Sequence, residues 1–159
     1  MEILKNYIDG VWTPSTSKET IDIVNPATQE VLAKVPYGKD IQKDVDLAVE
    51  TASKAYKEWS KVPVIKRVQV LYHLKALMEE NTEVLAEIIT KESGKTYGES
   101  VGEIQRAIEN IEVACGTPML MAGDVIEDIA TGIDEMMIRQ PIGVAACITP
   151  FNFPSMIVF

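Results

Sequence analysis

The chain has 159 residues, of which 47% are hydrophobic and 25% are charged, and this ordinary globular composition excludes an intrinsically disordered chain. Acidic residues outnumber basic ones by 24 to 15, and the net charge of -9 argues against nucleic-acid binding because it repels phosphate backbones. No apolar run approaches the roughly 20 residues that span a bilayer, and the two cysteines form no CxxC motif. We therefore predict a cytoplasmic protein with no membrane segment, disulfide framework or metal site.

The first forty residues are predicted to be mostly extended. In residues 6–14, NYIDGVWTP, an Asp-Gly pair stands between two short runs of β-forming residues. Asp-Gly favours a tight hairpin turn, because such turns need positive φ angles, so a β-hairpin is expected to open the chain. Two further strand-like runs, 21–24 and 30–35, lie on either side of an Asn25-Pro26 turn.

Four helices are predicted in the middle of the chain, over about residues 40–59, 63–78, 81–94 and 97–116. Apolar residues recur at helical spacing in each segment, which predicts amphipathic helices. Asp40 is a suitable N-cap for the first helix, and Pro63 suits the first turn of the second. Gly94 and Gly116 are suited to end the third and fourth helices.

The pattern changes after Gly123. Residues 125–130 and 133–139 predict an antiparallel strand pair around Thr131-Gly132. Residues 143–148, GVAACI, form a short uninterrupted apolar run, which is typical of a strand covered on both faces in a parallel α/β sheet. The last residues, MIVF, are apolar, and because natural domain ends are usually polar we expect the source protein to continue beyond them.

The segment ITPFNFP, residues 148–154, follows that predicted strand directly. Open α/β sheets place ligand sites at the carboxyl ends of their strands, and the Asn152 amide there has the chemistry to stabilise an oxygen that becomes negative during a reaction. From these residues alone, the competing interpretation is that Asn152 only closes a turn between two prolines.

ITPFNFP is similar to a motif of the aldehyde dehydrogenase family, and other segments carry the same resemblance: YIDGVW in the hairpin, VNPAT at 24–28, Trp59 and EIITKESGKT at 87–96. Phe151 in the motif, together with the stretch GEIQRAIENIEVACG at 102–116, resembles the methylmalonate-semialdehyde subgroup in particular. The resemblance implies an α/β fold, the N-terminal portion of the aldehyde dehydrogenase fold with an incomplete Rossmann-like NAD-binding domain.

The resemblance also divides the chain into three parts. Residues 1–122 would be the hairpin and helices of the NAD-binding domain, residues 123–141 an oligomerisation strand pair, and residues 142–159 the first Rossmann-like strand with the catalytic asparagine loop. It implies a homo-oligomer, a dimer or a tetramer, that acts on a small-molecule semialdehyde.

The resemblance assigns roles to four residues. Asn152 would be catalytic, Thr149 and Phe151 would contact NAD, and Arg106 would bind the substrate carboxylate, for which a guanidinium is suited because it stays charged and donates two parallel hydrogen bonds. The alternative for Arg106 is a surface ion pair with Glu103 or Glu109, three residues to either side. Phe151 has an ordinary core position as its alternative, and no GxGxxG fingerprint supports NAD independently.

The complete protein would then oxidise malonate or methylmalonate semialdehyde with NAD, and coenzyme A would accept the acyl group with release of carbon dioxide. The family's cysteine nucleophile belongs to a later segment, so we expect no turnover from these 159 residues alone. Cys147 is interpreted as a buried, inert thiol in the apolar strand, and Cys115 as a core residue. The remaining alternatives are a non-acylating aldehyde dehydrogenase and a binding or assembly module that pairs through the strands at 125–139.

Overall fold

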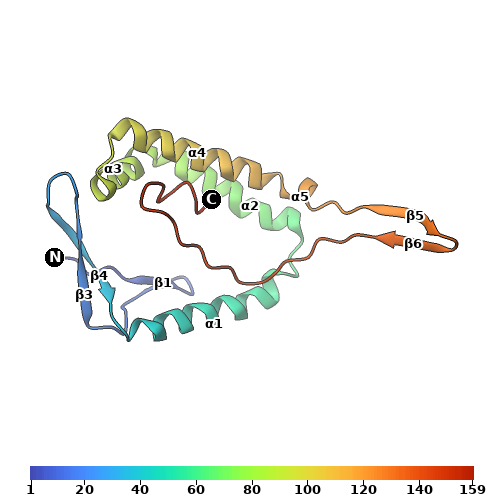
Figure 1. The fold of residues 1–159 in the computed structure, drawn as a ribbon, viewed down its shortest axis with the longest axis horizontal. Coiled ribbons are helices and arrows are strands. Elements are labelled where there is room, and N and C mark those ends of the chain that lie inside the picture. The colour runs from blue at the N-terminus through green and yellow to red at the C-terminus, as the bar shows by residue number, and fades with distance from the viewer.

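The computed structural model describes residues 1–159 and consists of small antiparallel sheets, a helical bundle and a projecting strand pair (Figure 1). The strands pair as β1 with β2, β3 with β4, and β5 with β6, in three separate two-stranded sheets. The elements in chain order are β1 Asn6–Ile8, β2 Val11–Thr13, β3 Glu19–Val24, β4 Val31–Tyr37, α1 Ile41–Trp59, α2 Val64–Glu80, α3 Thr82–Ser93, α4 Tyr97–Cys115, α5 Thr117–Leu120, β5 Val125–Ala130 and β6 Ile133–Met136.

The predicted N-terminal hairpin is confirmed. Ile8 pairs with Val11 across the turn, and Asp9 and Gly10 both have positive φ angles, 54° and 76°, as a tight turn between twisted strands requires. The other two N-terminal strands also form as predicted, and they make a longer antiparallel ladder of their own.

The four predicted helices are confirmed, with two differences at their ends. Asp40 stands at the start of α1, but its side chain makes no capping hydrogen bond; its carboxylate lies 3.4 Å from the Lys43 ammonium group instead. Gly116 ends α4, but the short helix α5 follows at once from Thr117, with Pro118 in its first turn, where proline is compatible with a helix. Gly94 ends α3 with a φ of 74°, a left-handed conformation that favours glycine.

The hydrophobic core lies between α2, α3 and α4, which pack together in the upper part of Figure 1. Each of its buried residues lies on the side of its helix that faces the other two helices. These residues are Val68, Met78, Ile89, Ile104, Ala107, Ile108, Ile111 and Cys115. Cys115 is thereby confirmed as a core residue. None of the helices combines the length and the apolar character needed to cross a membrane.

α1 lies apart from this bundle and is attached to the N-terminal strands by one buried carboxylate. Asp44 in the first turn of α1 accepts hydrogen bonds from the Asn6 amide (3.1 Å), the Thr16 backbone amide (3.0 Å), the Thr16 hydroxyl (2.8 Å) and the Ser15 hydroxyl. The Ser15 hydroxyl and then the Thr16 amide lower the pKa of Asp44 from 3.8 to about 2, because they favour the charged form.

Replacing Asp44 with asparagine is expected to destabilise the protein in a pH-dependent way. The folded pKa lies below the unfolded one, so the stabilising effect of the carboxylate is complete above about pH 4 and disappears as the pH falls toward 2. The difference in free energy of unfolding between wild type and Asp44→Asn, measured in urea at several pH values, should therefore be largest near neutrality. A difference that stays constant from pH 7 down to pH 3 would contradict this assignment.

The strand pair β5–β6 projects from the helices, as predicted, and every residue in both strands is exposed. β6 ends at Met136, three residues before the predicted end. At the base of the pair the backbone runs so close that a Cβ atom on Gly123 would lie 1.9 Å from the Met137 carbonyl oxygen. Only a glycine fits at this close approach.

The predicted buried strand at 143–148 is not formed. This segment runs back between α1 and the bundle (Figure 1), makes no strand pairing, and is mostly exposed. A parallel strand needs neighbouring strands for its backbone hydrogen bonds, and none of the three two-stranded sheets includes this segment. The prediction that Cys147 is buried was wrong for the same reason: with no sheet around it, its thiol is exposed.

Candidate functional site

The segment 149–154 forms a turn that lies between two cavities. The Phe153 amide donates a hydrogen bond to the Pro150 carbonyl (3.2 Å), and the two prolines at 150 and 154 restrict the backbone on either side. Thr149 and Phe151 line one cavity, whereas Asn152 and Phe153 line the other. The predicted site residues are therefore divided between two neighbouring surfaces of a single turn.

The cavity beside Asn152, which we call the α4 cavity, has a volume of about 600 Å³. Arg106 lines the same cavity, so the structure brings together the two residues to which a catalytic and a substrate-binding role were assigned. Gly98, Gly102 and Arg106 follow at intervals of four along α4, which places them on one helix face. A Cβ atom on either glycine would meet nothing within 4 Å, so this wall of the cavity is open helix backbone leading to the guanidinium group. The full lining is Lys95, Gly98, Glu99, Gly102, Glu103, Arg106, Asn152 and Phe153.

The side chains of Arg106 and Asn152 form no hydrogen bond or ion pair with another side chain. Arg106 takes part in none of the seven ion pairs of the structure, so the alternative of a surface pair with Glu103 or Glu109 was wrong. The backbone carbonyl of Asn152 accepts a hydrogen bond, but its exposed side-chain amide makes none. The guanidinium donors of Arg106 and the amide donor of Asn152 are thus both open to a ligand in the α4 cavity.

A buried ion pair holds the turn against α4. Glu103 is 2% exposed, and its carboxylate accepts hydrogen bonds from the Lys95 ammonium group (2.6 Å) and from the backbone amides of Ser155 (2.8 Å) and Met156 (3.2 Å). Lys95 also donates to the Asn152 carbonyl (2.6 Å). Burial raises the pKa of Glu103, but these hydrogen bonds outweigh burial, so its pKa lies below the ordinary value.

Our sequence interpretation missed this ion pair, although a signal was present. Ser100, Glu103, Ala107 and Ile111 lie at spacings of three and four on the buried face of α4. An acidic residue inside an apolar helical stripe is expected to have a specific partner, because burying an unpaired charge is costly. The sequence does not identify that partner as Lys95, which lies in the link between α3 and α4.

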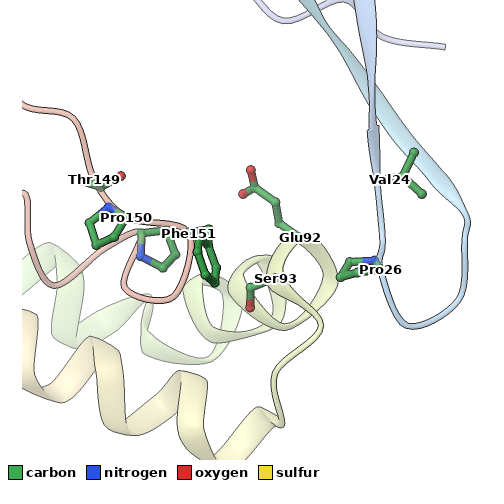
Figure 2. A pocket seen from close by; sticks show the side chains of 8 residues that line it. Val24, Pro26, Glu92, Ser93, Thr149, Pro150 and Phe151 are labelled. Atoms are coloured by element: carbon green, nitrogen blue, oxygen red, sulfur yellow. The ribbon is translucent and has the colours of Figure 1, made fainter.

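The cavity on the other side of the turn has a volume of about 550 Å³, and Figure 2 shows its lining. Phe151 is 91% exposed, so the alternative of an ordinary core aromatic was wrong. The Phe151 ring, several prolines and the Thr149 hydroxyl would fit the flat ring of a nucleotide cofactor. Glu92 at the end of α3 also lines this cavity and would repel a pyrophosphate group. No cluster of three or more histidine, cysteine, aspartate or glutamate side chains is arranged to hold a metal ion.

The α4 cavity therefore offers two kinds of free hydrogen-bond donor, an amide and a guanidinium group, and such donors suit a ligand with negatively charged or polarised oxygen atoms. The sequence model described as "Aldehyde dehydrogenase family" matches residues 12–159. The chain therefore belongs to the aldehyde dehydrogenase family, and the predicted family and fold class are confirmed.

Within the family, the chain is similar to several semialdehyde dehydrogenases. The chain is 50% identical to malonate-semialdehyde dehydrogenase 2 of Bacillus mycoides and 48% identical to malonate-semialdehyde dehydrogenase 1 of Geobacillus kaustophilus, and the matches cover 99% and 98% of this chain. A structure described as a methylmalonate-semialdehyde dehydrogenase from Sinorhizobium meliloti in complex with NAD superposes with a TM-score of 0.92 at 38% identity, over 99% of this chain. The chain spans about a third of the length of each, 32%, 31% and 32% respectively.

Proposed function

We propose that this chain forms the N-terminal part of an NAD-dependent, coenzyme A-acylating dehydrogenase of malonate or methylmalonate semialdehyde. The observation that carries the proposal is that Arg106 and Asn152 line one cavity with their donors free. A semialdehyde acid has a carboxylate at one end and an aldehyde at the other. The two donor groups match these two ends.

In the proposed reaction each residue acts on one end of the substrate. The Arg106 guanidinium group binds the carboxylate with two parallel hydrogen bonds and so orients the chain of the substrate. The Asn152 amide donates to the aldehyde oxygen, which becomes negative as a cysteine thiolate from outside these 159 residues adds to the carbon. NAD, when bound, accepts a hydride from that carbon. The C–C bond to the carboxylate breaks to release carbon dioxide, and a proton takes its place on the remaining carbon. The thiol of coenzyme A then displaces the enzyme cysteine and carries away the acyl group.

The α4 cavity has a neutral lining, with Lys95 and Arg106 balanced by Glu99 and Glu103, but one of its cations is available to an anionic substrate. Lys95 and Glu103 neutralise each other at 2.6 Å, and the Glu99 carboxylate is engaged by Thr96 in the capping box of α4. Arg106 is the remaining cation without a partner in the lining of the cavity. In a chain with a net charge of -9, a local positive group of this kind attracts a carboxylate that the rest of the surface repels.

The second cavity is proposed to receive the nicotinamide end of NAD, with Thr149 and Phe151 in contact with it. The exposed apolar residues of the β5–β6 pair support assembly into a homo-oligomer, a dimer or a tetramer, because unpaired strand edges bind further strands. The proposed function does not depend on the nicotinamide site or on the oligomer.

The proposal is tested by assaying the full-length protein for NADH formation. We expect turnover with malonate semialdehyde that depends on coenzyme A, and much weaker turnover with propanal at the same concentration, because propanal has no carboxylate for Arg106. Equal rates with both aldehydes, independent of coenzyme A, would instead indicate a non-acylating aldehyde dehydrogenase. An absence of NADH formation with either substrate would favour a binding or assembly role.

A further inference from the structure

We infer that Lys95 and Glu103 are positioning residues for Asn152, and that they fix its amide relative to Arg106. This inference rests on the proposed function, because it assigns the ion pair a role in the same reaction. It concerns two residues that do not touch the reacting atoms themselves. They act through the backbone of the turn that carries Asn152.

The hydrogen bonds of the pair secure the turn at two places. Lys95 holds the carbonyl oxygen of Asn152 itself, at 2.6 Å. Glu103 holds the amides of Ser155 and Met156, at 2.8 and 3.2 Å. Because the backbone is thus fixed at Asn152 and again at Ser155 and Met156, the backbone direction at Asn152, which lines the α4 cavity, is set.

The pair itself is held by the ends of two helices. Lys95 lies between Gly94, the left-handed residue that ends α3, and Thr96, whose capping box begins α4. The Lys95 ammonium group also lies 5.3 Å from the centre of the Phe153 ring, within the range of a cation–π interaction. These contacts leave the Lys95 side chain 17% exposed and that of Glu103 1% exposed. A pair so well enclosed resists solvent screening, unlike a surface ion pair.

The position of Glu103 on α4 links the two ends of the proposed substrate site. Glu103 and Arg106 are three residues apart on one helix, which corresponds to a rise of roughly 4.5 Å along its axis. The residue that holds the turn and the residue that binds the carboxylate therefore belong to one rigid element. The turn that carries Asn152 is therefore tied to the same helix that carries the Arg106 guanidinium group.

The test is a double-mutant cycle in the full-length protein, with Lys95→Met and Asn152→Ala singly and together. We expect Lys95→Met to lower kcat by about 10- to 100-fold with little change in KM, since a misplacement of about 1 Å can cost that much. In the Asn152→Ala background the same substitution should lower kcat less than about twofold, because the amide that it positions is already gone. An equal loss of kcat in both backgrounds would overturn the inference, because Lys95 would then act on the fold in general.

Two further variants keep the test decisive if Lys95→Met folds poorly. The double substitution Lys95→Met with Glu103→Met removes both charges together and leaves no unpaired buried ion. It also removes the hydrogen bond to the Asn152 carbonyl and the acceptor of the Ser155 and Met156 amides. It should show the same loss of kcat and faster hydrogen exchange at the amides of residues 155–156. Lys91→Met is the matched control, because Lys91 makes an exposed ion pair on α3 at 3.6 Å; it should change neither readout. Unchanged exchange in the double variant would also overturn the inference.

The cycle is run with propanal as well as malonate semialdehyde. Asn152 is proposed to act on the oxygen of any aldehyde, so the coupling between Lys95 and Asn152 should appear with both substrates. A protein that oxidises only propanal would refute the proposed substrate. The cycle with propanal would still decide the role of the ion pair, so the two failures are distinguishable.

Discussion

Replacing Asn152 with alanine is expected to lower kcat of the full-length protein by about 10²- to 10³-fold, the usual cost of losing one donor to a developing oxyanion. The Asn152 amide is exposed and unengaged in the α4 cavity, so its removal leaves no buried group unsatisfied and should not affect folding. The loss should therefore appear in kcat with malonate semialdehyde, measured as NADH formation under saturating substrate, with an unchanged melting temperature.

The aspartate variant at the same position separates a catalytic role from a structural one. Asn152→Asp preserves the shape of the side chain but adds a negative charge beside the developing oxyanion, so it should be slower than Asn152→Ala. Were Asn152 only closing a turn, the isosteric aspartate would be the milder change, and that order would refute the assignment. Asn81→Ala is a matched control. Asn81 is an exposed residue between α2 and α3 that does not line the cavity, and its side chain bonds only locally, to the Leu77 carbonyl; the kcat of this variant should equal that of wild type.

The elements that the sequence predicted well are those with local physical signals. The Asp9-Gly10 turn and the left-handed Gly94 at the end of α3 depend on the φ angles of single residues. The helices follow from apolar residues at spacings of three and four, which would form a buried stripe in almost any context. These features needed no information on the rest of the protein.

The segment at 143–148 shows the limit of such local signals. Its apolar run is suited to a buried strand, but the strand depends on hydrogen bonds from neighbouring strands that are distant in sequence. None of the strands β1 to β6 pairs with this run, so it forms no strand in this chain, and Cys147 is exposed with it. The composition of a segment indicates whether it favours a buried strand. Whether the strand forms depends on neighbouring strands that can pair with it.

The candidate site was predictable in part. The motif around Asn152 and the position of Arg106 could be found from family resemblance, but not that they line a common cavity, because helix α4 and the turn meet only in the folded chain. Sequence spacing suggested Glu103 as a partner of Arg106, three residues away. In the structure Glu103 points toward the core side of α4 and pairs with Lys95, since residues three apart share a helix face only approximately.

Replacing Arg106 with methionine is expected to raise KM for malonate semialdehyde by about 10- to 100-fold, because a charge-assisted hydrogen-bonded pair contributes about 1.5–3 kcal/mol. Arg106 makes no ion pair in the structure, and it is exposed at the wall of the α4 cavity. Its removal therefore costs no folded-state contact. The effect should be confined to substrates that carry a carboxylate, which steady-state kinetics with two aldehydes will measure.

Propanal is the control for this variant, because it presents the same aldehyde without a carboxylate. Its kcat/KM should be unchanged in Arg106→Met, so the ratio of kcat/KM for malonate semialdehyde to that for propanal should fall by the same 10- to 100-fold that KM rises. Arg106→Lys should fall between wild type and Arg106→Met, since lysine keeps the charge but not the planar pair of donors. If both aldehydes lost activity equally, Arg106 would be supporting the cavity and not binding a carboxylate, and the preference for semialdehyde acids would have to arise from residues outside this chain.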